Sequence, residues 1–342
     1  MIQKTLDLGP IHPWLPGAMK LSLDLRGDQI VSSRAEFGYL GKSIESKVKG
    51  QKISDAQRFF GHLEPESAFA LDRIFSETIE KALELRISGR SGWIRELTTL
   101  ISELNGYLKY LALMAGRLGL PILAHILLKH REQLLDLIEL LTGSRYGYSF
   151  LQPGGSRYDV TDGFIERLDA WMNAYEKDYS RIEAMYLWTH PFHNRLKSLG
   201  RVIDDGSLGF VSRAAVETTA YGWVSHAESR LLYALKQTVE ISDDLHTLIS
   251  ERHLGDFQIK PLSEIEQTQP KLKKVSGALS TGRGNWSLEL ELDGGLLIDQ
   301  MRVQSPSHEI SRAIPGALED ESYEDIPLIL QSLNFLVTEI DR

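Results

Sequence analysis

Apolar and polar residues alternate near the start of the chain. The segment MKLSLDLRGDQIVSSRAEFGYL, residues 19–40, places apolar side chains at nearly every second position on both sides of Arg26-Gly27-Asp28. This period of two is typical of strands that bury one face, and a short turn with glycine joins antiparallel neighbours. The pattern predicts a β-hairpin over residues 18–40.

The apolar positions then change to the spacing of helices. Pro121 and Gly143 bracket one such segment with a proline start and a glycine stop. Thr161 and Asp162 stand where they can cap the next helix. The predicted helices cover residues 65–85, 92–120, 121–143, 163–187 and 226–249.

Alternation returns towards the end of the chain. Residues 274–306 read as a β-meander with Asp293-Gly294-Gly295 as a turn, and residues 325–337 as a final helix. We therefore expect one mainly α (α+β) domain over residues 1–342. It consists of a β-hairpin at 18–40, a helical core at 41–255, and a β-meander with a closing helix at 270–342.

Composition narrows the class of protein. Apolar residues make up 42% and charged residues 25% of the 342 residues, as in soluble globular proteins. The net charge of −9 argues against nonspecific binding to nucleic acid, whose phosphates favour basic faces. We expect no direct membrane span, because no run of eighteen uncharged apolar residues occurs. The start of the chain also lacks the pattern of a secretory signal.

Cysteine is absent from the chain. This excludes disulfides, thiolate nucleophiles, and zinc, nickel or iron–sulfur centres bound through this chain's own sulfur. His190 and His193 in HPFH can share one helical face, but a metal needs further ligands that the neighbouring residues do not supply. We therefore interpret them as surface or core histidines. The glycine turns lack the spacing of a phosphate-binding loop.

Seven short segments, taken in order, resemble one family. They are GPIHPWLPG at 9–17, GYLGKSIES at 38–46, ISELNGYLKYL at 101–111, residues 131–164 with LTGSRYGYSFLQPGGSRYD, GFVSRAA at 209–215, STGRGN at 280–285 and SLNFLVTEIDR at 332–342. They are similar to motifs of the [NiFe]-hydrogenase large subunit and of its descendant, the 49-kDa subunit (the D subunit) of respiratory complex I. The resemblance implies the hydrogenase large-subunit fold.

The resemblance also locates the family's metal-binding cysteines. In RFFGHLEPESAF their positions hold Phe60 and Leu63, and near the C-terminus they hold Leu336 and Glu339. Hydrocarbon cannot replace soft thiolate ligands, and a lone carboxylate is a poor ligand for nickel. We expect no metal, no cofactor bound by this chain, and no hydrogenase activity from it alone.

In the complex I branch of the family, a histidine and a tyrosine hold the quinone headgroup. The resemblance places these two at Pro16 and Gly61, and neither side chain donates a hydrogen bond. Quinone binding would need a rebuilt cavity, with His62, Tyr39 or Glu45 as candidates. Alternatives stay open for two of them: His62 as a structural or exposed histidine and Glu45 as a helix-start charge.

Other positions that face the partner's iron–sulfur cluster in the family have changed as well. They hold Gly41-Lys42-Ser43 and Tyr110. The family thus implies a component similar to the D subunit, in a complex I-related or membrane-bound hydrogenase-related oxidoreductase. This component would have no NiFe centre and a lost or altered quinone site.

The resemblance also implies partners. It predicts docking to an iron–sulfur small subunit, other hydrophilic-arm subunits and a membrane arm of antiporter-like proteins. We expect a peripheral position on the cytoplasmic face of the inner membrane. The alternative is a non-redox scaffold or assembly protein with the same fold.

Overall fold

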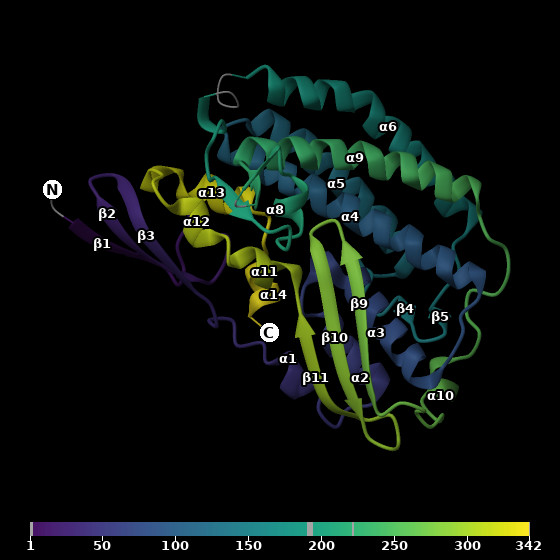
Figure 1. The fold of residues 1–342 in the computed structure, drawn as a ribbon. Coiled ribbons are helices and arrows are strands. Elements are labelled where there is room, and N and C mark those ends of the chain that lie inside the picture. The colour runs from purple at the N-terminus through teal and green to yellow at the C-terminus, as the bar shows by residue number, and fades with distance from the viewer. Residues whose placement is uncertain (1–2, 190–193, 221, 342) are drawn as a thin grey trace.

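The N-terminal residues form the predicted hairpin and add a strand to it. The computed structural model describes residues 3–189, 194–220 and 222–341. β2 (Lys20–Arg26) and β3 (Gln29–Glu36) pair antiparallel, and β1 (Gln3–Leu8) pairs with the other edge of β2. Every second residue of β2 is buried, as the alternation predicts. This sheet extends from one end of the body (Figure 1).

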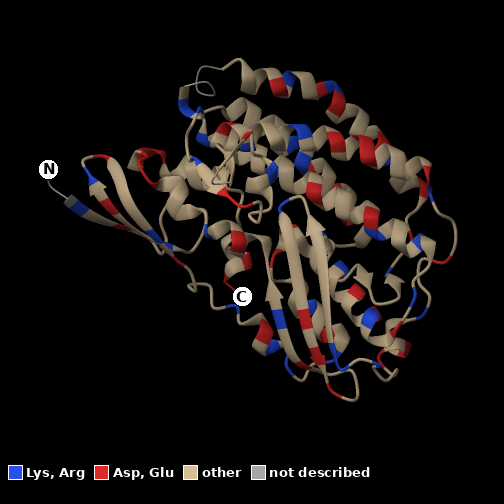
Figure 2. Cartoon of the chain, in the orientation of Figure 1, with Lys and Arg blue, Asp and Glu red and all other residues tan. Residues whose placement is uncertain are grey.

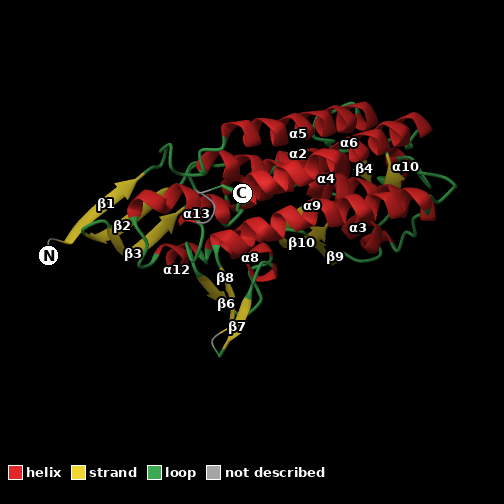
Figure 3. Ribbon diagram, turned by 90° about the horizontal axis from the view of Figure 1, so that it is seen from above, coloured by secondary structure: helices red, strands yellow, loops and turns green. Residues whose placement is uncertain are grey.

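Five long helices form the body, and each matches a predicted segment. They are α3 (Ala68–Leu83), α4 (Gly89–Arg117), α5 (Pro121–Thr142), α6 (Asp162–Leu187) and α9 (Ala227–Ser250). α4 is central, because it packs against α3, α5 and α9, and α6 lies across α5 and α9 (Figures 1 and 3).

The predicted helix ends have physical causes in the structure. Gly143 caps α5 with a left-handed φ of 75°, which costs glycine little. The Thr161 hydroxyl accepts a hydrogen bond from the Phe164 N–H at 3.2 Å and so caps α6.

The predicted meander is a three-stranded antiparallel sheet that packs on α3. Its order is β11 (Ile298–Gln304), β10 (Gly284–Leu292) and β9 (Lys274–Thr281). The chain then returns through η2 (Tyr323–Asp325) and four short helices, α11 (Pro306–Ser311), α12 (Ile314–Leu318), α13 (Ile326–Ser332) and α14 (Val337–Ile340). The predicted closing helix is broken here, since Asn334 has a φ of 56°.

The core between residues 41 and 255 also contains strands that the sequence pattern does not predict. β6 (Val202–Asp204), β8 (Gly222–Ser225) and β7 (Glu217–Thr219) form one small sheet, and β4 (Leu151–Gln152) pairs with β5 (Gly155–Ser156). Two to four residues carry too few alternating positions to identify a strand. The remaining short elements are α1 (Ile44–Lys47), α2 (Ile53–Gly61), η1 (Pro65–Ser67), α8 (Phe210–Arg213) and α10 (Leu262–Ile265).

A buried ion pair joins α3 to α4 and supports the turn at Gly154 and Gly155, in the family-like segment 131–164. Arg95 binds Glu80 through two hydrogen bonds of 2.6 and 2.8 Å. Glu80 also accepts the Gly154 N–H at 2.7 Å. The next residue, Gly155, has a φ of 150°, and a Cβ atom there would lie 2.1 Å from the Phe257 carbonyl oxygen. Only glycine fits at this close approach.

Charged residues of both signs are intermixed along the helices (Figure 2). No helix in the described part of the chain is long and apolar enough to cross a membrane. His190 and His193, interpreted above as surface or core histidines, lie outside the described residues.

Candidate functional site

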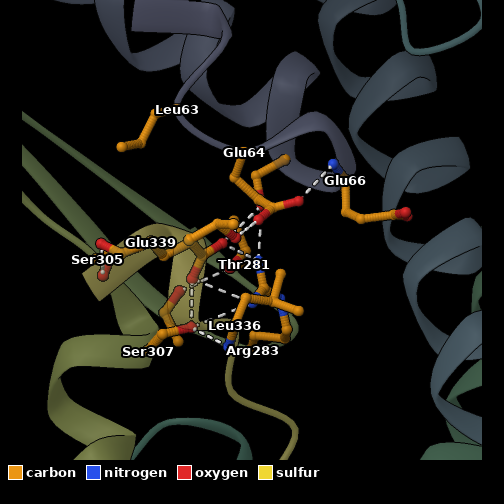
Figure 4. A network of polar contacts seen from close by, with 12 residues as sticks. Leu63, Glu64, Glu66, Thr281, Arg283, Ser305, Ser307, Leu336 and Glu339 are labelled. Carbon is orange, nitrogen blue, oxygen red and sulfur yellow. Dashed lines mark hydrogen bonds and ion pairs between the residues drawn. The ribbon is translucent and has the colours of Figure 1, made fainter. Parts of the chain in front are cut away.

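Four segments that are distant in the sequence meet at one polar centre (Figure 4). They are the stretch after α2 with η1, the turn between β9 and β10, the start of α11, and α14. Of the four positions that the resemblance assigns to metal ligands, Phe60 lies at the end of α2 and Leu63 just after it, and Leu336 and Glu339 lie at the start of α14 and within it. The short turns bring side chains more than 200 residues apart into direct contact.

Phe60 in α2 and Leu63 just after it belong to the hydrophobic core and not to the polar network. Both side chains are completely buried in the hydrophobic cluster that α2 and α3 form with the C-terminal sheet. The Phe60 ring packs against Phe75 with centroids 6.0 Å apart. The two positions that the resemblance assigns to sulfur ligands are thus part of a packed core.

Glu339 makes the polar side and is completely buried. Arg283, from the β9–β10 turn, binds both of its carboxylate oxygens, with Nη1 to Oε2 at 3.1 Å. The hydroxyls of Ser67 and Ser307 donate to the same carboxylate, the first at 2.9 Å. Arg283 also donates to Ser67 at 2.6 Å. A carboxylate is tolerated in this interior because one cation and several donors satisfy it.

Burial and Glu339 shift the pKa of Arg283 in opposite directions. Burial tends to lower the pKa of the guanidinium, but the charge and hydrogen bonds of Glu339 outweigh it and hold the pKa above its usual value. Arg283 therefore stays charged. Leu336 holds another position that the resemblance assigns to a ligand; its N–H donates to Ser307 at 2.9 Å, which ties the α14 segment to α11.

A second buried carboxylate, Glu64, lies beside this ion pair. Its oxygens accept hydrogen bonds from the Thr338 hydroxyl and from the Glu66 N–H, the latter at 3.1 Å. Burial and the neighbouring charge of Glu339 raise the pKa of Glu64 above its usual value, although Thr338 and Arg283 lower it in part. Two carboxylates thus compete for one arginine.

A third carboxylate, Glu66, has cations of its own. Lys109 on α4 and Arg131 on α5 bind its Oε1 at 3.0 and 2.8 Å, and Asn105 donates to Oε2 at 3.0 Å. Burial opposes ionisation, but the two cations lower the pKa of Glu66. This cluster fixes η1 against α4 and α5.

A cavity of about 70 Å³ lies on the α4 side of Arg283. Its lining includes Glu66, Glu103, Tyr107, Lys109, Arg283 and Leu336. Tyr110, at the cluster-side position of the family, is buried in its wall and donates to the Ser332 carbonyl at 3.3 Å. The volume is enough for a few waters and is below the roughly 300–1,000 Å³ of typical ligand pockets.

The two positions that the resemblance assigns to quinone binding, Pro16 and Gly61, lie outside that lining. Pro16 is exposed, and Gly61 is the buried last residue of α2. A Cβ atom on Gly61 would lie 3.8 Å from the Tyr148 ring and 3.6 Å from the Asp72 carboxylate. His62 is exposed, and its ring packs on Tyr148 with centroids 4.3 Å apart. The space beside Gly61 therefore borders an aromatic pair.

Tyr39 and Glu45 occupy two different places. Tyr39 is 44% exposed, next to Leu40, whose N–H donates to Asp341 at 2.7 Å. The Glu45 carboxylate accepts the Val303 N–H of β11 at 3.0 Å and lines a separate open hollow along the C-terminal sheet. Neither of them, nor His62, lines the cavity beside Arg283.

The sequence pattern does not indicate several members of the polar centre. Glu64, Ser67 and Ser307 belong to ordinary turn and helix-start sequences, LEPES and SPSHE. Arg283 lies in a segment that resembles the family, but nothing in the sequence pairs it with Glu339. Among the described residues, no group of three or more His, Asp or Glu side chains is arranged to hold a metal.

Comparison with known proteins gives concordant results. The family model described as respiratory-chain NADH dehydrogenase, 49 Kd subunit, matches residues 118–216. The chain is 24% identical to the D subunit of F(420)H(2) dehydrogenase from Methanosarcina mazei, with 98% of this chain and 97% of the relative covered. It is 22% identical to the D subunit of NADH-quinone oxidoreductase from Thermus thermophilus, with 99% and 94% covered.

The fold has a counterpart among solved structures. A chain in the structure of the membrane-bound sulfane sulfur reductase (MBS), an archaeal respiratory membrane complex, superposes with a TM-score of 0.90. The two sequences are 20% identical, and the match covers 99% of this chain and 98% of that chain. The predicted fold class is thereby confirmed. The resemblance in the sequence is confirmed as well: this cysteine-free chain is similar to the 49-kDa subunit of complex I and to D subunits of related dehydrogenases.

Proposed function

We propose that this chain is the large-subunit component of a complex I-related respiratory membrane complex, without a hydrogen-activating centre of its own. One observation carries the proposal. In a fold that a solved chain shares over 99% of this chain, Arg283 neutralises Glu339, at a position that the resemblance assigns to a metal thiolate. An arginine so placed would repel a metal cation and already satisfies the carboxylate.

The proposed role is to hold an electron-transfer partner in place. The chain would dock an iron–sulfur small subunit, and through it other hydrophilic-arm subunits and an antiporter-like membrane arm. Tyr39 and Leu40 support this assignment, because they are 44% and 40% exposed directly before Gly41-Lys42-Ser43, the loop that faces the cluster in the family. Adjoining exposed apolar side chains can contribute to a contact surface. The location would be peripheral, on the cytoplasmic face of the inner membrane.

We further propose that the family's quinone site is lost in its original form. Pro16 and Gly61 offer no side-chain donor to a quinone carbonyl. The Tyr148 ring beside Gly61 supports this view, because it borders the space that a side chain at residue 61 would enter. A purified complex is then expected to bind no quinone through these two residues, so that P16A leaves any quinone reduction by the complex unchanged.

The test is purification of the native protein from gently solubilised cells, followed by identification of the copurifying chains and analysis of nickel, iron and flavin. The proposal predicts a cysteine-rich partner with iron, and membrane proteins in the same fraction. Stoichiometric nickel on this chain would refute it. Recovery as a homo-oligomer without iron would refute it too, and would favour the non-redox scaffold.

A pair of matched variants sharpens the test. Leu40 is 40% exposed beside the proposed contact loop, and Leu272 is 41% exposed in the segment before the C-terminal sheet. L40D should reduce recovery of the iron–sulfur partner at least tenfold, since it places a charge in the contact, whereas L272D should retain it. Equal recovery with both variants would place the docking surface elsewhere.

A further inference from the structure

Glu64 occupies an unusual place for a carboxylate. Its side chain begins η1 by accepting the Glu66 N–H, and the residue is 4% exposed. Its other oxygen accepts the Thr338 hydroxyl from α14. Glu64 therefore connects the end of α2 with the last helix of the chain, 274 residues later.

The groups that face Glu64 do not balance its charge. Glu339 is a second buried carboxylate, and Arg283 is already bound to it. The Lys42 ammonium donates to the Leu63 carbonyl, and burial lowers the Lys42 pKa although Glu64, Asp341 and Glu339 oppose this. With Glu64 ionised, the three carboxylates Glu64, Glu339 and Asp341 exceed the two cations Arg283 and Lys42 by one negative charge; with Glu64 protonated, the charges of this group balance.

The C-terminal segment, residues 336–341, is held at this same point. Thr338 binds Glu64, Glu339 binds Arg283, and Asp341 accepts the Leu40 N–H at 2.7 Å. Val337 packs closely on Gly17, because a Cβ atom added to Gly17 would lie 2.9 Å from the Val337 Cβ. Repulsion between Glu64 and Glu339 acts across the contact between η1 and this segment.

We propose that Glu64 is a proton-binding site that couples uptake of one proton to closure of the C-terminal segment on the core. The proton comes from solvent and adds to a Glu64 carboxylate oxygen, so that the carboxyl group is neutral and no electron moves. Protonated Glu64 keeps its hydrogen bond to Thr338 without repelling Glu339. Loss of the proton restores the repulsion and loosens the segment.

The expected dependence on pH follows from linkage. Burial and Glu339 raise the pKa of Glu64 in the closed state, whereas an open segment exposes the carboxyl to water and returns it towards its usual value. Protonation of Glu64 therefore stabilises the closed segment fully below the usual glutamate pKa. This stabilisation is lost as the pH rises through the raised pKa of Glu64 in the closed state. Each pKa unit of difference corresponds to about a tenfold change in the opening equilibrium.

The experiment uses the isolated full chain, so its failure is distinct from failure of the proposed assembly. Hydrogen exchange of the amides of residues 336–341 is measured between about pH 4 and pH 9 and corrected for intrinsic rates. As the pH rises, the protection of these amides in the wild type should fall by about tenfold for each unit by which the Glu64 pKa in the closed state exceeds that in the open state. E64Q, which mimics the protonated group, should keep the protection of low pH throughout.

Two further variants keep the test decisive. T338V removes the hydrogen bond to Glu64 but leaves the repulsion between Glu64 and Glu339, so the segment should lose protection at every pH and still respond to pH, while carbon-13 NMR of the Glu64 carboxyl still shows titration. E321Q is the control, because Glu321 also has a pKa raised by burial but binds Gly200 N–H at 2.7 Å. A Glu64 pKa at its usual value would refute Glu64 as the proton-binding site. A pH response of the segment in E64Q equal to that of the wild type would refute its coupling to Glu64.

Discussion

Removal of Arg283 should destabilise the chain far more than loss of a surface ion pair. R283M leaves the carboxylate of Glu339, which is completely buried, without its cation, and Ser67 without its donor. Breaking a buried pair on one side costs about 3–5 kcal/mol. Unfolding entropy of roughly 2.1 cal/mol/K per residue over 342 residues amounts to about 0.7 kcal/mol/K. The melting temperature should then fall by about 4–7 °C.

Urea unfolding followed by circular dichroism, together with calorimetry, measures this change. K271M is the matched control, because Lys271 and Glu84 form an ion pair with both side chains 59% exposed, and its loss should cost at most about 1 kcal/mol. The double variant R283M/E339M should recover at least about 2 kcal/mol relative to R283M, since no unpaired charge stays buried. A cost of R283M below about 1 kcal/mol, or a double variant as unstable as the sum of both single ones, would refute the reasoning.

Three other predictions concern the fold. G155A should cost at least about 2 kcal/mol in urea unfolding, because its Cβ would meet the Phe257 carbonyl oxygen; a neutral result would contradict the close approach. T161A should cost about 1 kcal/mol through the lost cap of α6, and T161S, which keeps a hydroxyl, should recover most of it. Burial raises the pKa of Asp72 well above its usual value, so its contribution to stability is full at low pH and is lost as the pH rises through the raised pKa. D72N should therefore gain stability relative to wild type with rising pH, and parallel curves would show that Asp72 does not titrate in this range.

Local signals explain why some elements can be predicted. Pro121 and Gly143 bracket α5 because the first lacks an N–H that a helix start does not need and the second adopts a left-handed φ. The strands β9 and β10 alternate because one face packs on α3, and β11 packs against α1. Helix-end residues and strand alternation can be recognised because they depend on residues that are close together in the chain. The family-like motifs add the order in which the segments follow one another.

The sequence by itself determined the long helices, the two main sheets, the absence of any thiolate and the relationship to a family. Only the tertiary structure decided that Glu339 meets Arg283 and that Glu64 meets Thr338, at separations of 56 and 274 residues. The physical reason is that the charge state and role of a carboxylate depend on burial and on its partners in space, whereas helical and strand periodicity depends on residues close together along the chain.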